Sequence, residues 1–398
     1  MAAKLAPPDI PQSLAALTPE WLTLALGEKW LDGARVSHVE AEPLGEGVGF
    51  VGQLARLRLT LDGEAPSAPR SLVAKLPTQV PENRAVGEML GAYEREIQFY
   101  RDWAPRVAYR TARLYYADMD PNPASEHGPA IIRFLDRLPA WLMRWLLAFF
   151  GWVARKSTRR YLLLLEDLAP AELGDQVAGR SASECRAIVE HMARCQAASW
   201  GDPWLEEPYW AARLDLGLRL SRETFRGSRA AFEERFAAHL SDDDRAALAW
   251  LDAHGIELMQ RLHEEAPLTL MHGDFRLDNL FFENGRPPLL VDWQGVGVAP
   301  GVQDLAYFLS GTLPPETSAE DELALVRGYH DALLAHGVDG YDFDACLRDY
   351  RRCMLLGLQR LASIDLMDMG DARGDDLIHL WVRRTVARLR GIDRDALL

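Results

Sequence analysis

The fold is decided by one stretch, residues 268–297, which reads LTLMHGDFRLDNLFFENGRPPLLVDWQGVG. Two short apolar runs, residues 268–271 and 289–291, each end in a polar group that contains an aspartate. Asn279 lies between the two runs. Apolar runs of this length that stop at turn residues are typical of buried strands. The pattern therefore indicates two buried strands whose ends present carboxylate and amide groups.

Asp274, Asn279 and Asp292 are the candidate catalytic residues of this stretch. An Asn amide oxygen and an Asp carboxylate are the hard oxygen ligands that Mg²⁺ prefers, so Asn279 and Asp292 form a candidate metal site. Asp274 would then accept a proton from a substrate hydroxyl and orient it for attack on a phosphorus atom. The alternative interpretation is a polar turn of a hairpin, in which the aspartates act as caps.

Glycines recur upstream, in LGEGVGFVG at residues 44–52. Gly45, Gly47 and Gly49 would let the backbone approach an anion closely and point its N–H groups at it. A Gly-rich hairpin turn explains the same pattern. No helix pattern follows, which argues against a dinucleotide-binding fold, and the chain contains no G-x-x-x-x-G-K-[ST] sequence.

Lys75 lies inside an apolar strand pattern, SLVAKL at residues 71–76. A lysine is unfavourable there unless its ammonium group reaches solvent or an anionic partner. The following helical segment offers Glu88, Glu94 and Glu96, and we expect Glu96 to be the partner, with Glu94 second. A lysine on the exposed face of the strand is the alternative.

The kind of secondary structure that the sequence predicts changes near residues 166–170. Before this point, strand patterns such as residues 51–61 are flanked by helical patterns at 19–30 and 86–103, and YLLLLEDL at 161–168 reads as a buried strand. After it, long amphipathic segments dominate, at 181–199, 242–264, 319–336 and 343–364. We therefore predict an α+β chain, with a small β-rich lobe at residues 1–166 and a larger, mainly helical lobe at 167–398.

Composition narrows the class of protein. The formal charge is 44 minus 59, or −15, which argues against nucleic-acid binding. The first residues, MAAKLAPPDIPQSLAAL, contain no uninterrupted apolar segment of the kind that a signal peptide needs, so a cytoplasmic location is expected. The cysteines lack metal-type spacing and are expected to be core thiols. They are Cys185, Cys195, Cys346 and Cys353.

The aromatic segment at residues 138–160 reads LPAWLMRWLLAFFGWVARKSTRR. Its charge-free run, Trp145 to Val153, is far shorter than the ~20 residues that span a bilayer, so no transmembrane segment is expected. Aromatic residues followed by basic ones suit a helix that lies in a membrane interface or covers an apolar pocket. We expect the simpler alternative, a buried helix packed on its own domain.

Several of these motifs together resemble a known family. HGDFRLDN at 272–279 and VDWQ at 291–294 resemble the catalytic and metal-binding motifs of the aminoglycoside phosphotransferase and choline kinase superfamily, which is related to the protein kinases. The Gly-rich turn, Lys75, Glu96 and LLLLEDL occur in the same order. LEDL, DWQ and DLAYFL at 304–309 further resemble its ecdysteroid kinase-like branch and bacterial relatives. The resemblance implies a two-lobed protein-kinase-like fold, in which a small antiparallel β-sheet lobe, residues 1–166, binds the nucleotide and the lobe at 167–398 is catalytic and binds the acceptor. The chain departs from the family's simplest members by a longer insertion around residues 120–160, which we expect to be helical at about 136–160.

The resemblance also implies roles for these residues. Asp274 would be the catalytic base, and Asn279 with Asp292 would hold Mg²⁺. Lys75, fixed by Glu96, would contact the α- and β-phosphates of ATP. The backbone of the Gly-rich turn would cover the phosphates.

Other roles follow from the same resemblance. The backbone at Leu165, Glu166 and Leu168 would bond the adenine. His272 would brace the catalytic loop, and Asp304 would cap or anchor a helix. This chain has Asp-Trp-Gln where protein kinases have Asp-Phe-Gly, so we expect a metal site that is formed at all times.

The implied activity is ATP- and Mg²⁺-dependent transfer of a phosphoryl group to the hydroxyl of a small molecule. Aromatic residues favour a small apolar acceptor, such as a steroid-like or acyl alcohol, whereas the acidic stretch at 363–376 would suit an aminoglycoside or amino alcohol. A non-catalytic nucleotide-binding module and a membrane-surface lipid kinase are the alternatives. The aromatic residues concerned are Trp200, Trp204, Tyr209 and Trp210, together with those of residues 138–153.

Overall fold

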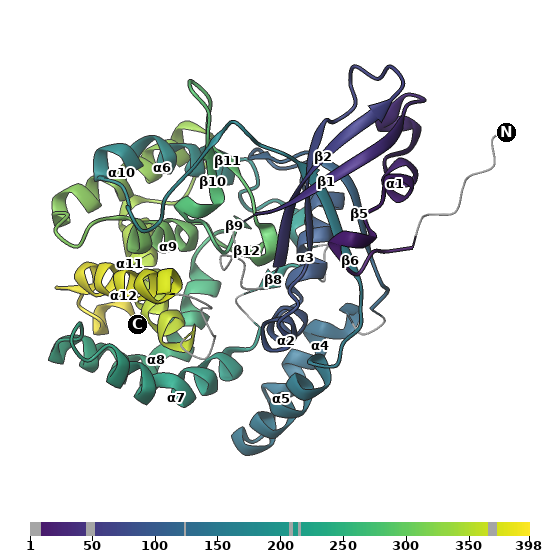
Figure 1. Cartoon of the computed structure of the whole chain (residues 1–398). Coiled ribbons are helices and arrows are strands. Elements are labelled where there is room, and N and C mark those ends of the chain that lie inside the picture. Colours follow the sequence, from purple (N-terminus) through teal and green to yellow (C-terminus); the bar gives the residue numbers. More distant parts are fainter. Residues whose placement is uncertain (1–8, 45–51, 123–124, 207–209, 214–215, 365–371) are drawn as a thin grey trace. The chain divides into compact units, whose positions relative to one another are not determined.

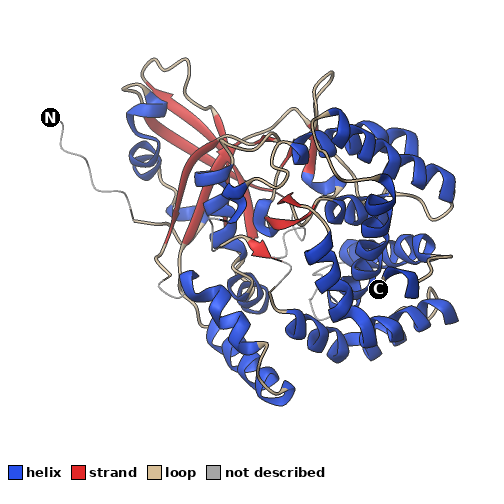
Figure 2. Cartoon of the chain, turned by 180° about the vertical axis from the view of Figure 1, so that it is seen from behind, coloured by secondary structure: helices blue, strands red, loops and turns tan. Residues whose placement is uncertain are grey.

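The computed structural model describes residues 9–44, 52–122, 125–206, 210–213, 216–364 and 372–398 (Figure 1). The chain divides into two compact units. The first contains Met1–Pro105, Thr111–Pro123 and Ala148–Pro170, and the second contains Arg106–Arg110, Ala124–Leu147 and Ala171–Leu398. Strands and helices occur in both, as the red and blue ribbons of Figure 2 show, so the expected α+β class is confirmed.

The first unit is built on a five-stranded sheet in the order β1-β2-β3-β6-β5, with every neighbouring pair antiparallel. Alternate residues of the strands point into a core that includes Leu57, Leu72 and Leu162, each fully buried. The strands predicted at 51–61, 71–76 and 161–168 are thereby confirmed. The strand bounds are β1 Arg35–Leu44, β2 Gly52–Asp62, β3 Ser71–Pro77, β5 Leu114–Met119 and β6 Tyr161–Glu166.

Helix α1, Pro19–Leu31, begins where the sequence predicts. The Thr18 hydroxyl accepts a hydrogen bond from the Trp21 N–H at 3.2 Å, and proline occupies the first helical position. The single helix predicted over 86–103 is wrong. Gly91 has a φ of 64°, a left-handed conformation that glycine adopts without strain, and it separates two helices. They are α2, Pro81–Met89, and α3, Ala92–Gln98, which continues into a π-helical turn at Phe99–Trp103.

The second unit is mainly helical. The four long predicted segments form helices, and serine caps fix two of their starts through Ser181 with Glu184 and Ser241 with Asp244. All four cysteines are buried, as expected. The helices are α4 Gly128–Leu135, α6 Ala182–Ala197, α7 Leu218–Arg235, α8 Asp242–Glu265, α9 Val302–Thr312, α10 Ala319–Ala335, α11 Phe343–Ile364 and α12 Ala372–Leu389.

Two small sheets complete the second unit, in the orders β4-β11-β10-β7 and β8-β12-β9. They contain the two strands predicted within residues 268–297, which lie at Leu268–Met271 and Leu289–Leu290. Their strands are β4 Arg110–Thr111, β7 Glu172–Leu173, β8 Ala212–Arg213, β9 Leu268–Met271, β10 Leu280–Phe282, β11 Leu289–Leu290 and β12 Gly297–Pro300.

The aromatic segment forms helix α5, Ala140–Ala154, but the prediction that it is buried is wrong. Met143 is its one buried side chain, whereas Trp141 and Trp145 are 67% and 60% exposed. Hydropathy shows that a helix is apolar but does not show which of its faces has a packing partner. Among the described residues, no helix has the length and apolar character needed to cross a membrane.

His191 on α6 makes the stability of the second unit depend on pH. The Arg194 guanidinium donates to Nδ1 of His191 at 2.7 Å, which requires this nitrogen to be unprotonated. Burial, followed by the charges of Arg194 and Arg110, lowers the pKa of His191 from 6.5 to about 4. The unfolded chain therefore binds one more proton between these pH values, so folding stability falls as the pH falls.

We expect this histidine to reduce the free energy of unfolding by up to about 3 kcal/mol as the pH falls from about 6.5 to about 4. Denaturant unfolding of the wild type and of His191→Gln at both pH values measures the effect. Glutamine still offers an acceptor to Arg194 but does not titrate, so the variant should lose less stability on acidification. Equal losses in both proteins would contradict the prediction.

Candidate functional site

The candidate catalytic loop joins β9 to β10 and is held by pairing on both sides. Met271 pairs with Gly297 in one small sheet, and Leu280 pairs with Leu290 in the other. The Val291 N–H also donates to the Asn279 carbonyl at 3.0 Å. The polar groups of residues 272–279 and 291–296 are therefore brought to the same region, as the sequence pattern predicts.

Asp274 is held by hydrogen-bond donors on both carboxylate oxygens. The Tyr307 hydroxyl donates to Oδ1 at 2.7 Å, and the Asn279 amide donates to Oδ2 at 3.0 Å. The same amide donates to the Asp274 carbonyl at 2.9 Å. The Arg276 guanidinium approaches Oδ2 at 3.4 Å. The carboxylate is thus fixed in one orientation, as a group that must align a substrate hydroxyl requires.

The orientation of Asn279 bears on metal binding. Its side chain is buried, and both amide N–H bonds are directed at Asp274, so the amide oxygen is the atom that it can offer to a cation. Asp292 follows Val291, whose backbone is bonded to Asn279. An amide oxygen and a carboxylate fit the preference of Mg²⁺ for oxygen ligands. The described residues contain no cluster of three or more His, Cys, Asp or Glu side chains placed to hold a metal.

The backbone around Asp274 is fixed by Asp304, on α9. Asp304 is fully buried, and its carboxylate accepts the N–H groups of His272 at 2.7 Å and Gly273 at 2.9 Å. Burial raises the pKa of Asp304, and the two N–H donors and His272 partly offset this. The carboxylate anchors the catalytic loop to α9 from inside the protein. No described side chain makes a capping hydrogen bond at the start of α9, so the capping role expected for Asp304 is not observed.

His272 and Gly273 bind the catalytic loop to the Asp-Trp-Gln segment. Nε2 of His272 bonds the Val291 carbonyl at 2.9 Å, and Nδ1 accepts the Asp274 N–H at 3.2 Å. Gly273 has a φ of 80°, and a Cβ atom there would collide with the carbonyl oxygen of Gly295. Only glycine therefore permits this close approach. His272 therefore braces the catalytic loop, as expected.

The Asp-Trp-Gln segment is anchored by its tryptophan. Trp293 is fully buried, its indole N–H donates to the Leu290 carbonyl at 3.1 Å, and its ring lies 4.6 Å from that of His272. Asp292 has a left-handed backbone with a φ of 64°, and its carboxylate accepts from the Gln294 amide at 3.3 Å. The expectation that the segment keeps one conformation stays a prediction.

Arg276 sets the charge balance of the loop. Its guanidinium also bonds the Asp278 carboxylate at 3.1 Å. Burial works against its charged form, but the acidic groups of Asp274, Tyr307, Asp278 and Asp292 outweigh it and raise the pKa of Arg276. A permanent cation next to Asp274 limits the repulsion between the carboxylates of the site.

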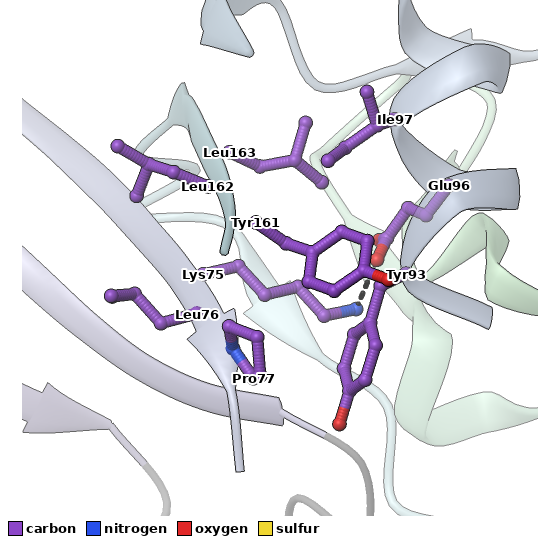
Figure 3. Close-up of a pocket in the computed structure, with 9 residues that line it drawn as sticks. All are labelled: Lys75, Leu76, Pro77, Tyr93, Glu96, Ile97, Tyr161, Leu162 and Leu163. Carbon is purple, nitrogen blue, oxygen red and sulfur yellow. Dashed lines mark ion pairs between the residues drawn. The ribbon is translucent and has the colours of Figure 1, made fainter. Parts of the chain in front are cut away.

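Lys75 and Glu96 belong to the first unit, where they line a small pocket (Figure 3). The Lys75 ammonium lies 2.7 Å from the Glu96 carboxylate, and both side chains are largely buried. The predicted pairing is confirmed, and the exposed-lysine alternative is wrong. A Cβ atom on Gly52 would lie 3.2 Å from Cε of Lys75, so this glycine makes room for the lysine stem. The pocket is completed by Leu76, Pro77, Tyr93, Ile97, Tyr161, Leu162 and Leu163.

The three candidate adenine-binding residues lie at the end of β6. Leu165 is buried and pairs with Val73, and the Glu166 N–H donates to the Arg113 carbonyl at 2.9 Å. The sheet therefore uses the Glu166 N–H, whereas Leu168 lies beyond the strand end. The glycines of the predicted phosphate-covering turn, Gly45, Gly47 and Gly49, lie outside the described residues.

Tyr307 and Arg276 are site residues that were not predicted from the sequence. Tyr307 follows Asp304 by three residues on α9, a spacing that places both side chains on one face of the helix. One of them holds the loop backbone and the other holds Asp274. The spacing of Asp304 and Tyr307 within DLAYFL was the one sequence feature that could have predicted a role for Tyr307. Arg276 stood within the quoted motif, but its contacts depend on how the loop folds.

Known proteins resemble this chain in their family profile or in their fold. The profile of the ecdysteroid kinase-like family matches residues 46–338. The structure of a choline kinase from Cryptosporidium parvum is 10% identical over 96% of this chain and 94% of its own, with a TM-score of 0.52. An aminoglycoside phosphotransferase from Streptomyces rimosus is 17% identical over 85% of this chain and 97% of its own, with a TM-score of 0.43. No curated protein matches the sequence.

At these identities the likeness to the choline kinase shows the fold alone, and it confirms the expected protein-kinase-like fold. The family profile covers more than half of the chain and includes Lys75, Glu96 and the whole decisive stretch. The chain therefore belongs to the ecdysteroid kinase-like family.

Proposed function

We propose that the protein is an ATP- and Mg²⁺-dependent phosphotransferase that acts in the cytoplasm on the hydroxyl group of a small, largely apolar metabolite. The observation that carries this proposal is the fixed carboxylate of Asp274, with Tyr307 and Asn279 as donors on its two oxygens. Phosphoryl transfer needs little covalent help from a protein, so a group that orients the attacking hydroxyl is the central requirement.

In this proposal Asp274 aligns the acceptor hydroxyl and takes its proton as the acceptor oxygen bonds to the γ-phosphorus of ATP. The bond from this phosphorus to the β–γ bridging oxygen breaks, and ADP leaves. Tyr307 and Asn279 hold the carboxylate so that it does not turn away from the acceptor. Burial, and then the charge of Asp274, raise the pKa of Tyr307, so its hydroxyl remains a donor at neutral pH. Arg276 carries positive charge beside the reacting groups.

Asn279 and Asp292 would hold Mg²⁺, through an amide oxygen and a carboxylate. Mg²⁺ held by these two side chains would supply positive charge that offsets the charge developing on the phosphoryl group. Lys75, fixed by Glu96, would contact the α- and β-phosphates, and the glycines at 45, 47 and 49 would cover them. For the adenine we propose the backbone from Leu165 to Leu168, with the groups beyond the strand end favoured because the sheet already uses the Glu166 N–H.

The proposal is tested by incubating the protein with Mg²⁺–ATP and pooled hydroxylated metabolites and searching by mass spectrometry for a product heavier by one phosphoryl group. The pools should separate steroid-like and acyl alcohols from aminoglycosides and amino alcohols. A phosphorylated aminoglycoside or amino alcohol would show that the acceptor is cationic and not apolar. Stabilisation by Mg²⁺–ATP against heat, without any product, would favour a non-catalytic nucleotide-binding module.

Tyr307→Phe is expected to lower kcat by about 10–100-fold, because a hydrogen bond to a charged group contributes about 1.5–3 kcal/mol. The KM for ATP should change little, since Tyr307 contacts Asp274 and not the proposed nucleotide residues. Steady-state kinetics with the acceptor found above gives both values.

Tyr329→Phe is the matched control for this tyrosine. The Tyr329 hydroxyl is also buried and donates at 2.6 Å, but its acceptor is Gln196. Its loss should reduce stability and leave kcat within a few-fold of the wild type. Equal effects of the two substitutions on kcat would show that Tyr307 has only a structural role.

A further inference from the structure

Helix α5 exposes an aromatic stripe to solvent. Trp141, Trp145, Phe149 and Trp152 recur at intervals of four, four and three residues, which places them along one face of a helix. Their exposed fractions are 67%, 60%, 45% and 50%. In the described part of the chain, every large aromatic side chain with this degree of exposure lies on α4 or α5; the other two are Phe134 and Phe150.

Apolar side chains are also exposed on an element that precedes α5 in the chain and on one that contacts it. Ile131 and Phe134 are exposed on α4, which precedes α5 (Figure 1). Met89 and Leu90 are exposed at the end of α2, and a Cβ atom on Gly151 would lie 3.4 Å from the Met89 sulfur. Exposed apolar patches on this scale mark surfaces that bind a partner.

The charge around the stripe is opposite to that of the whole chain. Residues 128–160 contain seven Lys or Arg and one Asp, a net charge of +6, whereas the chain carries −15 and its remainder therefore −21. The single acid, Asp136, is directed at α7, where it accepts the Leu220 N–H at 3.1 Å. Five of the basic residues are exposed: Arg133, Arg137, Arg144, Arg155 and Lys156.

The geometry points to a partner of one kind: we infer that α5 lies in the headgroup region of a membrane that contains anionic lipids. Tryptophan and phenylalanine side chains insert at this boundary, while arginine and lysine at the edges of the helix contact lipid phosphates. The Lys156 ammonium lies 3.7 Å from the centre of the Trp152 ring, so a basic and an aromatic side chain are in contact at one end of the stripe.

Length and charge decide against other partners. A helix of 15 residues is about 22 Å long, too short to cross a hydrocarbon core of about 30 Å, so α5 would lie along the surface. In a symmetric dimer through this face, each basic segment would meet its own copy and like charges would repel. An anionic surface attracts this segment and repels the remaining negative surface, which fixes the orientation of binding.

Binding is measured by sedimenting the full chain with vesicles of phosphatidylglycerol and phosphatidylcholine in equal parts, and with phosphatidylcholine alone. We expect binding to the mixed vesicles, weaker binding to phosphatidylcholine, and partial release by salt. Trp145→Gln/Trp152→Gln should weaken binding to the mixed vesicles by about tenfold or more. Arg155→Gln/Lys156→Gln should do the same and remove most of the preference for anionic lipid.

Leu24→Gln/Leu334→Gln is the matched control, because these leucines are similarly exposed, at 48% and 46%, on α1 and α10. It should bind vesicles like the wild type. Circular dichroism establishes that each variant is folded, which the exposure of the substituted side chains favours.

Absence of wild-type binding to mixed vesicles, or equal loss in the leucine control, would overturn the inference. A dimer in light scattering that the tryptophan variant converts to monomer, without vesicle binding, would identify a self-association surface instead. Neither result depends on phosphotransfer. Evidence against membrane binding would therefore not count against the proposed phosphotransferase activity, which is tested separately.

Discussion

Asp274→Asn is expected to lower kcat by about 10²–10⁴-fold, the range over which a positioned general base contributes. Asparagine is close to aspartate in shape and still offers an oxygen to Tyr307, so the loop should keep its conformation. It has no carboxylate to orient and deprotonate the acceptor hydroxyl. The KM for ATP, or the Kd measured by calorimetry, should remain within a few-fold of the wild-type value.

Asp278→Asn provides the control for this substitution. Asp278 lies in the same loop and bonds Arg276, but its other carboxylate oxygen accepts the Gln176 N–H at 2.9 Å, which gives it a structural task. We expect this variant to lose some stability and to keep kcat within about tenfold of the wild type. Full activity in Asp274→Asn would end the assignment of Asp274 as the base.

Lys75→Ala is expected to reduce both stability and nucleotide use. The substitution removes the ammonium group that lies 2.7 Å from the carboxylate of Glu96, whose side chain is only 3% exposed. Breaking a buried ion pair in this way costs about 3–5 kcal/mol of unfolding free energy. The value of kcat/KM for ATP should fall by about 10²-fold, because a charged hydrogen bond to phosphate is lost.

A double substitution separates these two effects. Lys75→Met/Glu96→Leu replaces the ion pair with apolar side chains of similar volume, and such replacements are often neutral or stabilising. We expect denaturant unfolding to show recovered stability while kcat/KM for ATP stays low. Recovery of both would mean that Lys75 serves the fold and not the phosphates.

Arg58→Met controls for the loss of a cation from the same sheet. Arg58 is exposed on β2 and pairs with Glu42 at 3.3 Å, so its removal should change stability by no more than about 0.5 kcal/mol. The nucleotide kinetics of this variant should match the wild type.

Many helices and strands were predictable because sequence patterns within short segments determine them. The N-cap at Thr18, the alternation of β2 and the amphipathic helices after residue 180 are properties of short segments. The pairing of Lys75 with Glu96 was predictable because a lysine in an apolar strand requires an anion. The end of one helix and the start of the next at Gly91 were not predicted, because a glycine inside a helical pattern does not by itself indicate a left-handed backbone. The lobe boundary at 166–167 stays a prediction.

The sequence alone determined which chemical groups the protein has and in what order: a strand lysine, a loop with Asp274 and Asn279, and Asp292 after the next strand. The tertiary structure decided which groups fix them. It placed Tyr307 on Asp274 and Asp304 on the backbone of His272, and it left the aromatic face of α5 exposed. Hydrogen bonds across more than thirty residues and the burial of one helix face depend on packing between distant segments, which local sequence patterns do not encode.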